Sequence, residues 1–184
     1  KKRIIILEMF LVMIFTLCSC DKKEKSDNTE RNYITNAVAP EIYEIIRELN
    51  KHDIMFVAAS GRQLESQMLL FAPVADHISY ISENGAMCQL HGERHVISEF
   101  DRDFAMRIID ELEKRPECKV TISSPTTQYI KSGDDAFYKH MTTELKYHIT
   151  VIDSLTDINE PILKIAFLDT VNHDESFDHF NKLF

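Results

Sequence analysis

The stretch at residues 54–63, IMFVAASGRQ, is the strongest indication of the fold in this sequence. Its first six residues form an apolar run without polar alternation, which is typical of a strand buried on both faces of a parallel sheet. The run stops abruptly at Ser60, Gly61 and Arg62, which supply a hydroxyl, a bare backbone and a guanidinium. A bound phosphate needs these groups, but a helix start also uses Ser and Gly. The flanking sequence has to separate the two interpretations.

Helices and strands alternate around this predicted strand. Pro40 stands where a first helical residue would, and apolar residues recur at helical spacing through residues 42–49. Residues 62–71 predict a second helix, and HISYIS at 77–82 predicts a second strand that ends in Glu83-Asn84-Gly85. This is a βαβ arrangement with polar residues at two strand ends. In an open parallel sheet such ends are where ligands bind.

The chain changes character near residue 86, which we take as a boundary. Short strands at residues 86–90 and 94–98 flank His91-Gly92-Glu93 and predict a hairpin. The later elements mix helices and strands without strict alternation, which suits an α+β unit. We expect helices over residues 101–114, 134–145 and 174–184, and strands over 119–123, 148–153 and 162–168.

The N-terminus allows two interpretations. A basic start, an apolar run over residues 4–17 and a polar stretch after Cys20 follow the order of a secretory signal. The end of this segment resembles a bacterial lipoprotein signal, with Cys20 as the acylated residue, so residues 1–32 form a signal-like segment and a tether. The run is short for a transmembrane helix, and Glu8 is costly in hydrocarbon. The alternative is a strand or helix of the folded domain.

Composition excludes several classes of function. A net charge of −9 and a pI near 5.3 argue against nucleic acid as a partner. No G-x-G-x-x-G or P-loop pattern occurs among only four glycines. The cysteines show neither zinc spacing nor a disulfide framework. Cys88 and Cys118 are expected to be half-buried apolar residues.

The two polar strand ends can form a phosphate site. Ser60 can donate its hydroxyl to a phosphate oxygen, while the N–H groups of Gly61 and Arg62 would point out of a helix start whose dipole favours an anion. The alternative is that Ser60 caps the helix and Gly61 eases the turn. At the second end, Asn84 offers an amide to a substrate hydroxyl, although Asn-Gly is also an ordinary tight turn.

The order of these motifs resembles a known family. A strand ending in ASGR, a helix, a strand ending in ISENGA and a following α+β segment are similar to the haloacid-dehalogenase-like phosphatases, specifically the Cof-type (IIB) branch. Members of that branch typically dephosphorylate sugar phosphates and similar metabolites. The resemblance extends over residues 40–184. It implies an α/β fold, with a partial Rossmann-like parallel sheet core at 33–86 and an inserted α+β cap at 87–184.

The resemblance also implies roles for the residues at the strand ends. Ser60 would be the hydroxyl that binds the transferring phosphoryl group, and Gly61 would supply a backbone N–H to it. Arg62, Glu83 and Asn84 would line the site. The cap would select the substrate.

The chain departs from the family pattern in the motifs that carry the nucleophile and the metal ligands. The family uses Asp-x-Asp-Gly after a strand, with the first Asp as nucleophile and Mg²⁺ screening its charge. The segment before Pro40 offers only Asp27, which has no Asp two residues on and is not interpreted as the nucleophile. A Lys and a Gly-Asp…Asn-Asp metal motif should follow the cap, but the chain ends at Phe184. The implied Mg²⁺ therefore has no ligands in this chain.

Three other polar groups are interpreted as structural. Asp134 in Gly133-Asp134-Asp135 is expected to cap a helix, and Asp169 ends an apolar strand without a second Asp at 171. His91 and His95 flank the hairpin turn and are expected at the surface.

The sequence thus predicts a Mg²⁺-dependent phosphatase of small phosphorylated metabolites that works through an aspartyl-phosphate. The chain itself is expected to be inactive and, from its domain resemblance, cytoplasmic. The alternative is a non-catalytic lipoprotein, anchored at Cys20, that binds a ligand or partner through a phosphatase-like scaffold. A membrane is a partner only under that alternative.

Overall fold

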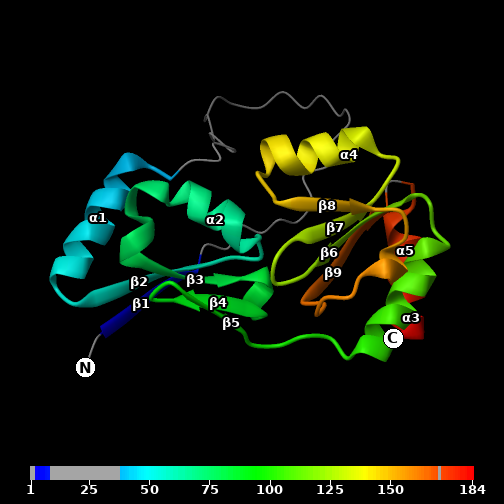
Figure 1. The fold of residues 1–184 in the computed structure, drawn as a ribbon, viewed down its shortest axis with the longest axis horizontal. Coiled ribbons are helices and arrows are strands. Elements are labelled where there is room, and N and C mark those ends of the chain that lie inside the picture. Colours follow the sequence, from blue (N-terminus) through cyan, green and yellow to red (C-terminus); the bar gives the residue numbers. More distant parts are fainter. Residues whose placement is uncertain (1–2, 9–37, 170) are drawn as a thin grey trace, which may run out of the picture.

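Two β-sheets lie side by side in the computed structural model, which describes residues 3–8, 38–169 and 171–184 (Figure 1). One sheet has five strands in the order β1-β2-β3-β4-β5, and the other has four in the order β8-β7-β6-β9. The chain passes from the first to the second after β5.

The first sheet is built from consecutive strands. Strands β1, β2 and β3 run parallel to one another, and the pairs β3–β4 and β4–β5 are antiparallel. Helices α1 and α2 lie against this sheet (Figure 1). The elements are β1 (Arg3–Glu8), α1 (Pro40–Lys51), β2 (Ile54–Ala59), α2 (Leu64–Leu70), the 3-10 turn η1 (Ala72–His77), β3 (Ile78–Ser82), the 3-10 turn η2 (Glu83–Gly85), β4 (Met87–Leu90) and β5 (Glu93–Val96).

The apolar patterns account for this half. Pro40 is the first residue of α1, as expected, because its fixed φ suits the first helical turn. Ile46 of α1 is 1% exposed and packs in one cluster with Phe56 of β2 and Tyr80 of β3. The strand predicted from residues 54–59 is confirmed at both ends.

The hairpin belongs to the first sheet. β4 pairs with β3 through Tyr80↔Gln89 and Ser82↔Met87, so the sheet runs on past residue 86. β4 and β5 therefore belong to the first sheet, because the tight turn at η2 brings β4 straight back along β3. The division into a core at 33–86 and a cap at 87–184 stays a prediction, and the chain leaves the first sheet only after Val96.

The N-terminal apolar run contributes a strand. β1 pairs in parallel with β2, from Arg3↔Ile54 to Glu8↔Ala59. For residues 3–8 this is the alternative interpretation, an element of the folded domain, rather than a signal segment. Cys20 and the tether lie outside the described residues, so acylation there stays a prediction.

The second sheet combines pairings that are distant in sequence. β6 lies between β7 and β9, antiparallel to both, and β7 pairs in parallel with β8. The elements are α3 (Arg102–Glu113), β6 (Cys118–Ser123), β7 (Gln128–Lys131), α4 (Asp135–Lys139), the π-helical turn η3 (His140–Glu144), β8 (Ile149–Ile152), the 3-10 turn η4 (Leu155–Asp157), β9 (Lys164–Asp169) and α5 (His173–Leu183).

Its core forms beneath α3 and α5. Ile109 of α3 and Ile122 of β6 are both 0% exposed, and the ring of Phe180 in α5 packs at a tilt against that of Phe167 in β9, with 4.7 Å between ring centroids. The sequence did not predict β7, because QYIK is a four-residue strand with a mixed pattern.

The helix expected over residues 134–145 is divided between α4 and η3. Asp134 caps α4 as predicted, since its side chain accepts the Phe137 N–H at 2.8 Å. His91 and His95 are exposed, and Cys88 and Cys118 are half-buried, which confirms the surface and apolar interpretations.

Candidate functional site

The two polar strand ends predicted from the sequence are neighbours in the structure. Ser60 follows β2, and its N–H donates to the carbonyl of Ile81 in β3 at 3.0 Å. The N–H of Glu83 donates to the carbonyl of Arg62 at 3.2 Å. The loop after β2 and the turn after β3 are therefore joined by backbone hydrogen bonds into one polar surface. We call residues 60–62 together with 83–84 the strand-end wall.

Ser60 is not the helix cap. The N-cap of α2 is Gln63, and the Ser60 hydroxyl oxygen accepts the Arg62 N–H at 3.2 Å. That bond occupies one of the two N–H groups expected to face a phosphate. Because α2 has only seven residues, its dipole contributes little anion attraction. The half-buried Ser60 hydroxyl keeps its own proton, since a hydroxyl that accepts can still donate.

The Asn84 side chain lies where a Cβ of residue 61 would be. A Cβ built at Gly61 would lie 2.2 Å from the Asn84 side-chain oxygen, far inside van der Waals contact. The sequence suggested that the missing Cβ leaves room for a ligand. In the structure that space is taken by the amide of Asn84, which is exposed and lies across the loop.

The backbone of the second strand end is held in a rare conformation. Glu83 and Asn84 have φ of 50° and 57°, followed by Gly85 at 96°. Left-handed residues other than Gly cost roughly 1–3 kcal/mol each and persist only where their surroundings hold them. Such backbone strain is common at functional sites, and here it fixes the direction of the Glu83 and Asn84 side chains.

Arg62 and Glu83, which were expected to line the site, are both buried. They are 7% and 2% exposed. Oε1 of Glu83 accepts no hydrogen bond from any of the described residues. A buried carboxylate oxygen without a donor is costly, so Glu83 is a strong candidate for a functional rather than a structural residue.

Lys164 is the residue that sequence reasoning missed. It begins β9 in the second sheet, and its ammonium pairs with Glu83 Oε2 at 2.5 Å and donates to the Gly61 carbonyl at 2.7 Å. The only signal in the sequence is a lone Lys between Leu163 and the apolar run that follows. No local pattern could place it 81 residues away against Glu83.

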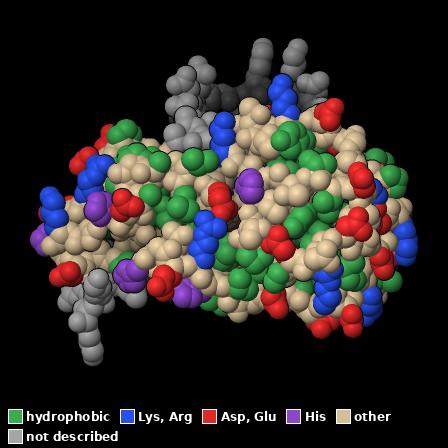
Figure 2. Space-filling view, viewed as in Figure 1, with side chains coloured by type: hydrophobic (Ala, Val, Ile, Leu, Met, Phe, Trp, Pro, Cys, Tyr) green, Lys and Arg blue, Asp and Glu red, His purple; other side chains and the backbone are tan. Residues whose placement is uncertain are grey.

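Further polar contacts tie the second sheet to the start of α2. The Gln63 amide donates to the His148 carbonyl at 3.0 Å and accepts the His148 N–H at 2.6 Å. Ser66 donates to the Leu145 carbonyl at 2.7 Å. Figure 2 shows acidic, basic and histidine side chains close together near the middle of the face in view. The strand-end wall therefore lies beside a polar interface between the sheets.

Tyr147 lies in this interface. Burial raises the pKa of its phenol to about 12, and the Glu83 carboxylate contributes to the same shift, while Arg62 opposes it. The phenol is therefore neutral at physiological pH and serves as a hydrogen-bonding group rather than an anion.

The strand beside β2 at this end of the sheet is β1. Its last residue, Glu8, is in register with Ala59, directly before Ser60. A carboxylate residue thus ends the strand beside β2, but residue 10 is Phe, so the Asp-x-Asp pair is absent there. Asp27 lies outside the described residues.

The wall does not fit a Mg²⁺ ion. Mg²⁺ prefers several oxygen ligands in octahedral geometry, usually including carboxylates. The one carboxylate of the wall, Glu83, is neutralised by Lys164, and the Asn84 oxygen lies against Gly61. No step of the chemistry is therefore assigned to a metal held by these residues.

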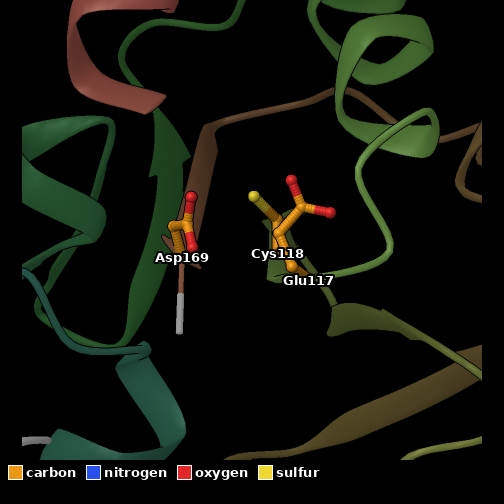
Figure 3. A group of neighbouring side chains, drawn as sticks. All are labelled: Glu117, Cys118 and Asp169. Carbon is orange, nitrogen blue, oxygen red and sulfur yellow. The ribbon is translucent and has the colours of Figure 1, made fainter. Parts of the chain in front are cut away.

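One cluster elsewhere has metal-ligand chemistry. Figure 3 shows Glu117, Cys118 and Asp169, whose candidate ligand atoms lie within 4.8 Å of one another. Hydrogen bonds from Ser176 and from the N–H groups of Asn172 and Val171 lower the Asp169 pKa and occupy both of its oxygens. Burial raises the pKa of the Cys118 thiol, which disfavours the thiolate that binds metals. The structural interpretation of Asp169 agrees with these contacts.

Residues 27–184 match the haloacid dehalogenase-like hydrolases. The chain belongs to that family. The resemblance drawn from ASGR and ISENGA is thereby confirmed. A curated relative in Escherichia coli (strain K12), 5-amino-6-(5-phospho-D-ribitylamino)uracil phosphatase YbjI, is 27% identical over 122 residues, which are 65% of this chain and 44% of the relative.

Solved structures share the α/β fold. A haloacid dehalogenase-like hydrolase from B. subtilis superposes with a TM-score of 0.64 at 16% identity, over 79% of this chain and 60% of that one. The subclass IIB sugar phosphatase BT4131 gives a TM-score of 0.62 at 14% identity, over 77% and 55%. The hydrolase chain spans about half the length of these relatives.

The described helices are also short for a lipid bilayer. None of those over residues 38–169 and 171–184 has the length and apolar character needed to cross a membrane.

Proposed function

We propose that this hydrolase family member contributes the phosphate-binding wall of a phosphatase that acts on small phosphorylated metabolites such as sugar phosphates. The observation that carries the proposal is the junction of the two strand ends, where Ser60 N–H bonds to Ile81 and Glu83 N–H bonds to Arg62. The name of the E. coli relative describes a phosphorylated ribityl compound, which falls within this class.

The chemistry assigned to the chain is binding and orientation. The Ser60 hydroxyl donates to an oxygen of the transferring phosphoryl group, and the Gly61 N–H donates to another. Hydrogen bonds to a charged group are worth roughly 1.5–3 kcal/mol each, so both together hold a phosphate firmly. Asn84, exposed at the edge of the wall, is placed to meet a hydroxyl of the substrate.

The covalent step belongs to residues that this wall does not supply. Transfer to an aspartate needs a carboxylate nucleophile in line with the leaving oxygen. The described strand end beside Ser60 offers Glu8 and no Asp-x-Asp pair. We therefore expect the 184-residue chain to bind phosphate without hydrolysing phosphate esters.

Two measurements on the 184-residue chain test this proposal. Isothermal titration with inorganic phosphate should show binding that Ser60→Ala weakens about tenfold or more, as expected for the loss of a charge-assisted hydrogen bond. Hydrolysis of p-nitrophenyl phosphate with Mg²⁺ should stay at the level of Ser60→Ala. If the wild type and Ser60→Ala bind phosphate equally, the role of Ser60 is refuted. If the wild type hydrolyses the ester with Mg²⁺ faster than Ser60→Ala, the expectation that this chain is inactive is refuted.

The lipoprotein alternative depends on Cys20. Pairing of β1 with β2 supports a folded-domain interpretation for residues 3–8. Mass spectrometry of the N-terminus from cells tests it: an acylated Cys20 would favour the alternative, and an unmodified N-terminal region would count against it.

A further inference from the structure

The ion pair between Glu83 and Lys164 joins the strand-end wall to the second sheet. The Glu83 side chain is 1% exposed and that of Lys164 is 18% exposed. Their residues come from η2 in the first sheet and from the first position of β9 in the second. A pair this withdrawn from water is screened weakly by salt, so its charges act strongly on their neighbours.

Lys164 also holds the loop that carries Ser60. Its ammonium donates to the Gly61 carbonyl at 2.7 Å. Gly61 in turn lies under the Asn84 side chain, and Asn84 adjoins Glu83. One ammonium therefore contacts both halves of the wall, the loop after β2 and the turn after β3.

The negative charge of Glu83 would oppose phosphate binding, and Lys164 offsets that charge. A phosphate monoester carries up to two negative charges, and an unpaired carboxylate within the same wall would repel it. The Lys164 ammonium placed against Oε2 relieves that repulsion. Oε1 of Glu83 remains without a donor from the described residues, so the pair leaves one acceptor for a ligand hydroxyl.

We propose that Lys164 is a positioning residue for the phosphate-binding wall: it neutralises the buried Glu83 carboxylate and fixes the Gly61 peptide, so that the wall accepts an anion only when β9 is docked against it. The proposal rests on the proposed function, because it concerns the same phosphate. It assigns to the second sheet a direct electrostatic part in anion binding.

The test uses the 184-residue chain with inorganic phosphate as the probe. Lys164→Met keeps the length of the side chain and removes its charge. We expect phosphate affinity to fall about tenfold, as for one like-charge interaction of roughly 1.4 kcal/mol. The double variant Glu83→Gln/Lys164→Met removes both charges and should recover most of that loss. A purely structural contact would not show this recovery.

A matched control separates charge from the loss of an inter-sheet bond. Ser66→Ala removes the hydrogen bond to Leu145 across the same interface, and a long 3.5 Å contact from the Arg62 guanidinium, without changing any charge. It should bind phosphate like the wild type. Circular dichroism and thermal melts confirm that each variant is folded, and Lys164→Arg, which keeps the cation, should bind within about threefold of the wild type.

The outcomes distinguish the two proposals. If Lys164→Met binds phosphate like the wild type while Ser60→Ala does not, the role of Lys164 is overturned and the phosphate wall stands. If the double variant is as weak as Lys164→Met, neutralisation of Glu83 is refuted. If the wild type and Ser60→Ala bind alike, or neither binds, the proposed function fails and the role of Lys164 fails with it.

Discussion

Glu160, half-buried in the loop before β9, and Glu83, buried at the end of the first sheet, are two carboxylates that are paired differently. Glu160 accepts from Ser124, Thr126 and Tyr129, so both of its oxygens have donors. Glu83 has an ammonium on Oε2 and no donor from the described residues on Oε1. Fully paired carboxylates stabilise a fold, whereas one left half-paired points to a ligand.

The same contrast extends to the backbone. The turn that carries Glu83 holds two non-glycine residues at positive φ, Glu83 and Asn84. The second sheet keeps its core in regular strands and in α3, with Ile122 and Ile109 fully buried. Two consecutive non-glycine residues at positive φ thus lie in the strand-end wall, away from the packed core of the second sheet. We expect substitutions in the two regions to separate stability from phosphate binding.

The largest expected effect comes from the core of the second sheet. Ile122→Ala removes a side chain that is 0% exposed and leaves a cavity beneath α3. The free energy of unfolding should fall by about 2–5 kcal/mol, measured by urea denaturation. Phosphate affinity of the protein that remains folded should be unchanged.

Val151→Ala, at a residue 46% exposed on β8, is the control and should stay within about 0.5 kcal/mol of the wild type. If folded Ile122→Ala loses phosphate affinity, the core of the second sheet affects binding as well as stability, and the expected division of roles between the two regions is wrong.

A smaller effect is expected at the contact inside the strand-end wall. Gly61→Ala places a Cβ only 2.2 Å from the side-chain oxygen of Asn84. The Asn84 side chain must swing away, which should lower stability by about 1–3 kcal/mol and weaken phosphate binding. Thermal melts and phosphate titration measure the two effects.

The background variant Asn84→Gly removes the obstacle and suits the positive φ of 57° at that position. In that background Gly61→Ala should lose much less stability than in the wild type. Equal losses in both backgrounds would show that Asn84 is not what requires glycine at 61.

The smallest effect concerns Glu160 and pH. Burial raises the pKa of this carboxyl, but hydrogen bonds from Thr126, Tyr129 and Ser124 outweigh it and bring the pKa below its ordinary value of 4.5. Because the folded pKa is lower than the unfolded one, Glu160 contributes stability above the unfolded pKa. That contribution is lost as the pH falls through the folded pKa.

Urea midpoints measured from about pH 7 down to about pH 3 should therefore decline below roughly pH 4.5, and Glu160→Gln should flatten part of that decline. An unchanged pH profile in Glu160→Gln would mean that the carboxylate is not the group that titrates.

Much of the first sheet was predictable because its signals are local. The apolar run at residues 54–59 gave β2 with correct bounds, and the periodicity from Pro40 gave the start of α1, which ends one residue later than predicted. The strand ends at Ser60 and Glu83 were predicted as neighbours, and they are. The hairpin was predicted too, but its membership of the first sheet was not, because a turn motif does not say which strand its arms will pair with.

The sequence by itself determined the order of the elements, the polar ends of β2 and β3, and membership of the family, since each depends on residues close together in the chain. Only the tertiary structure decided that Gly61 is covered by Asn84, that Ser60 bonds to Arg62 instead of capping α2, and that Lys164 reaches Glu83 from the other sheet. The physical reason is that an ion pair between residues far apart in sequence leaves no periodic or spacing signal. IMFVAASGRQ contains one of the two polar strand ends, and the fold adds Lys164, which contacts both of them.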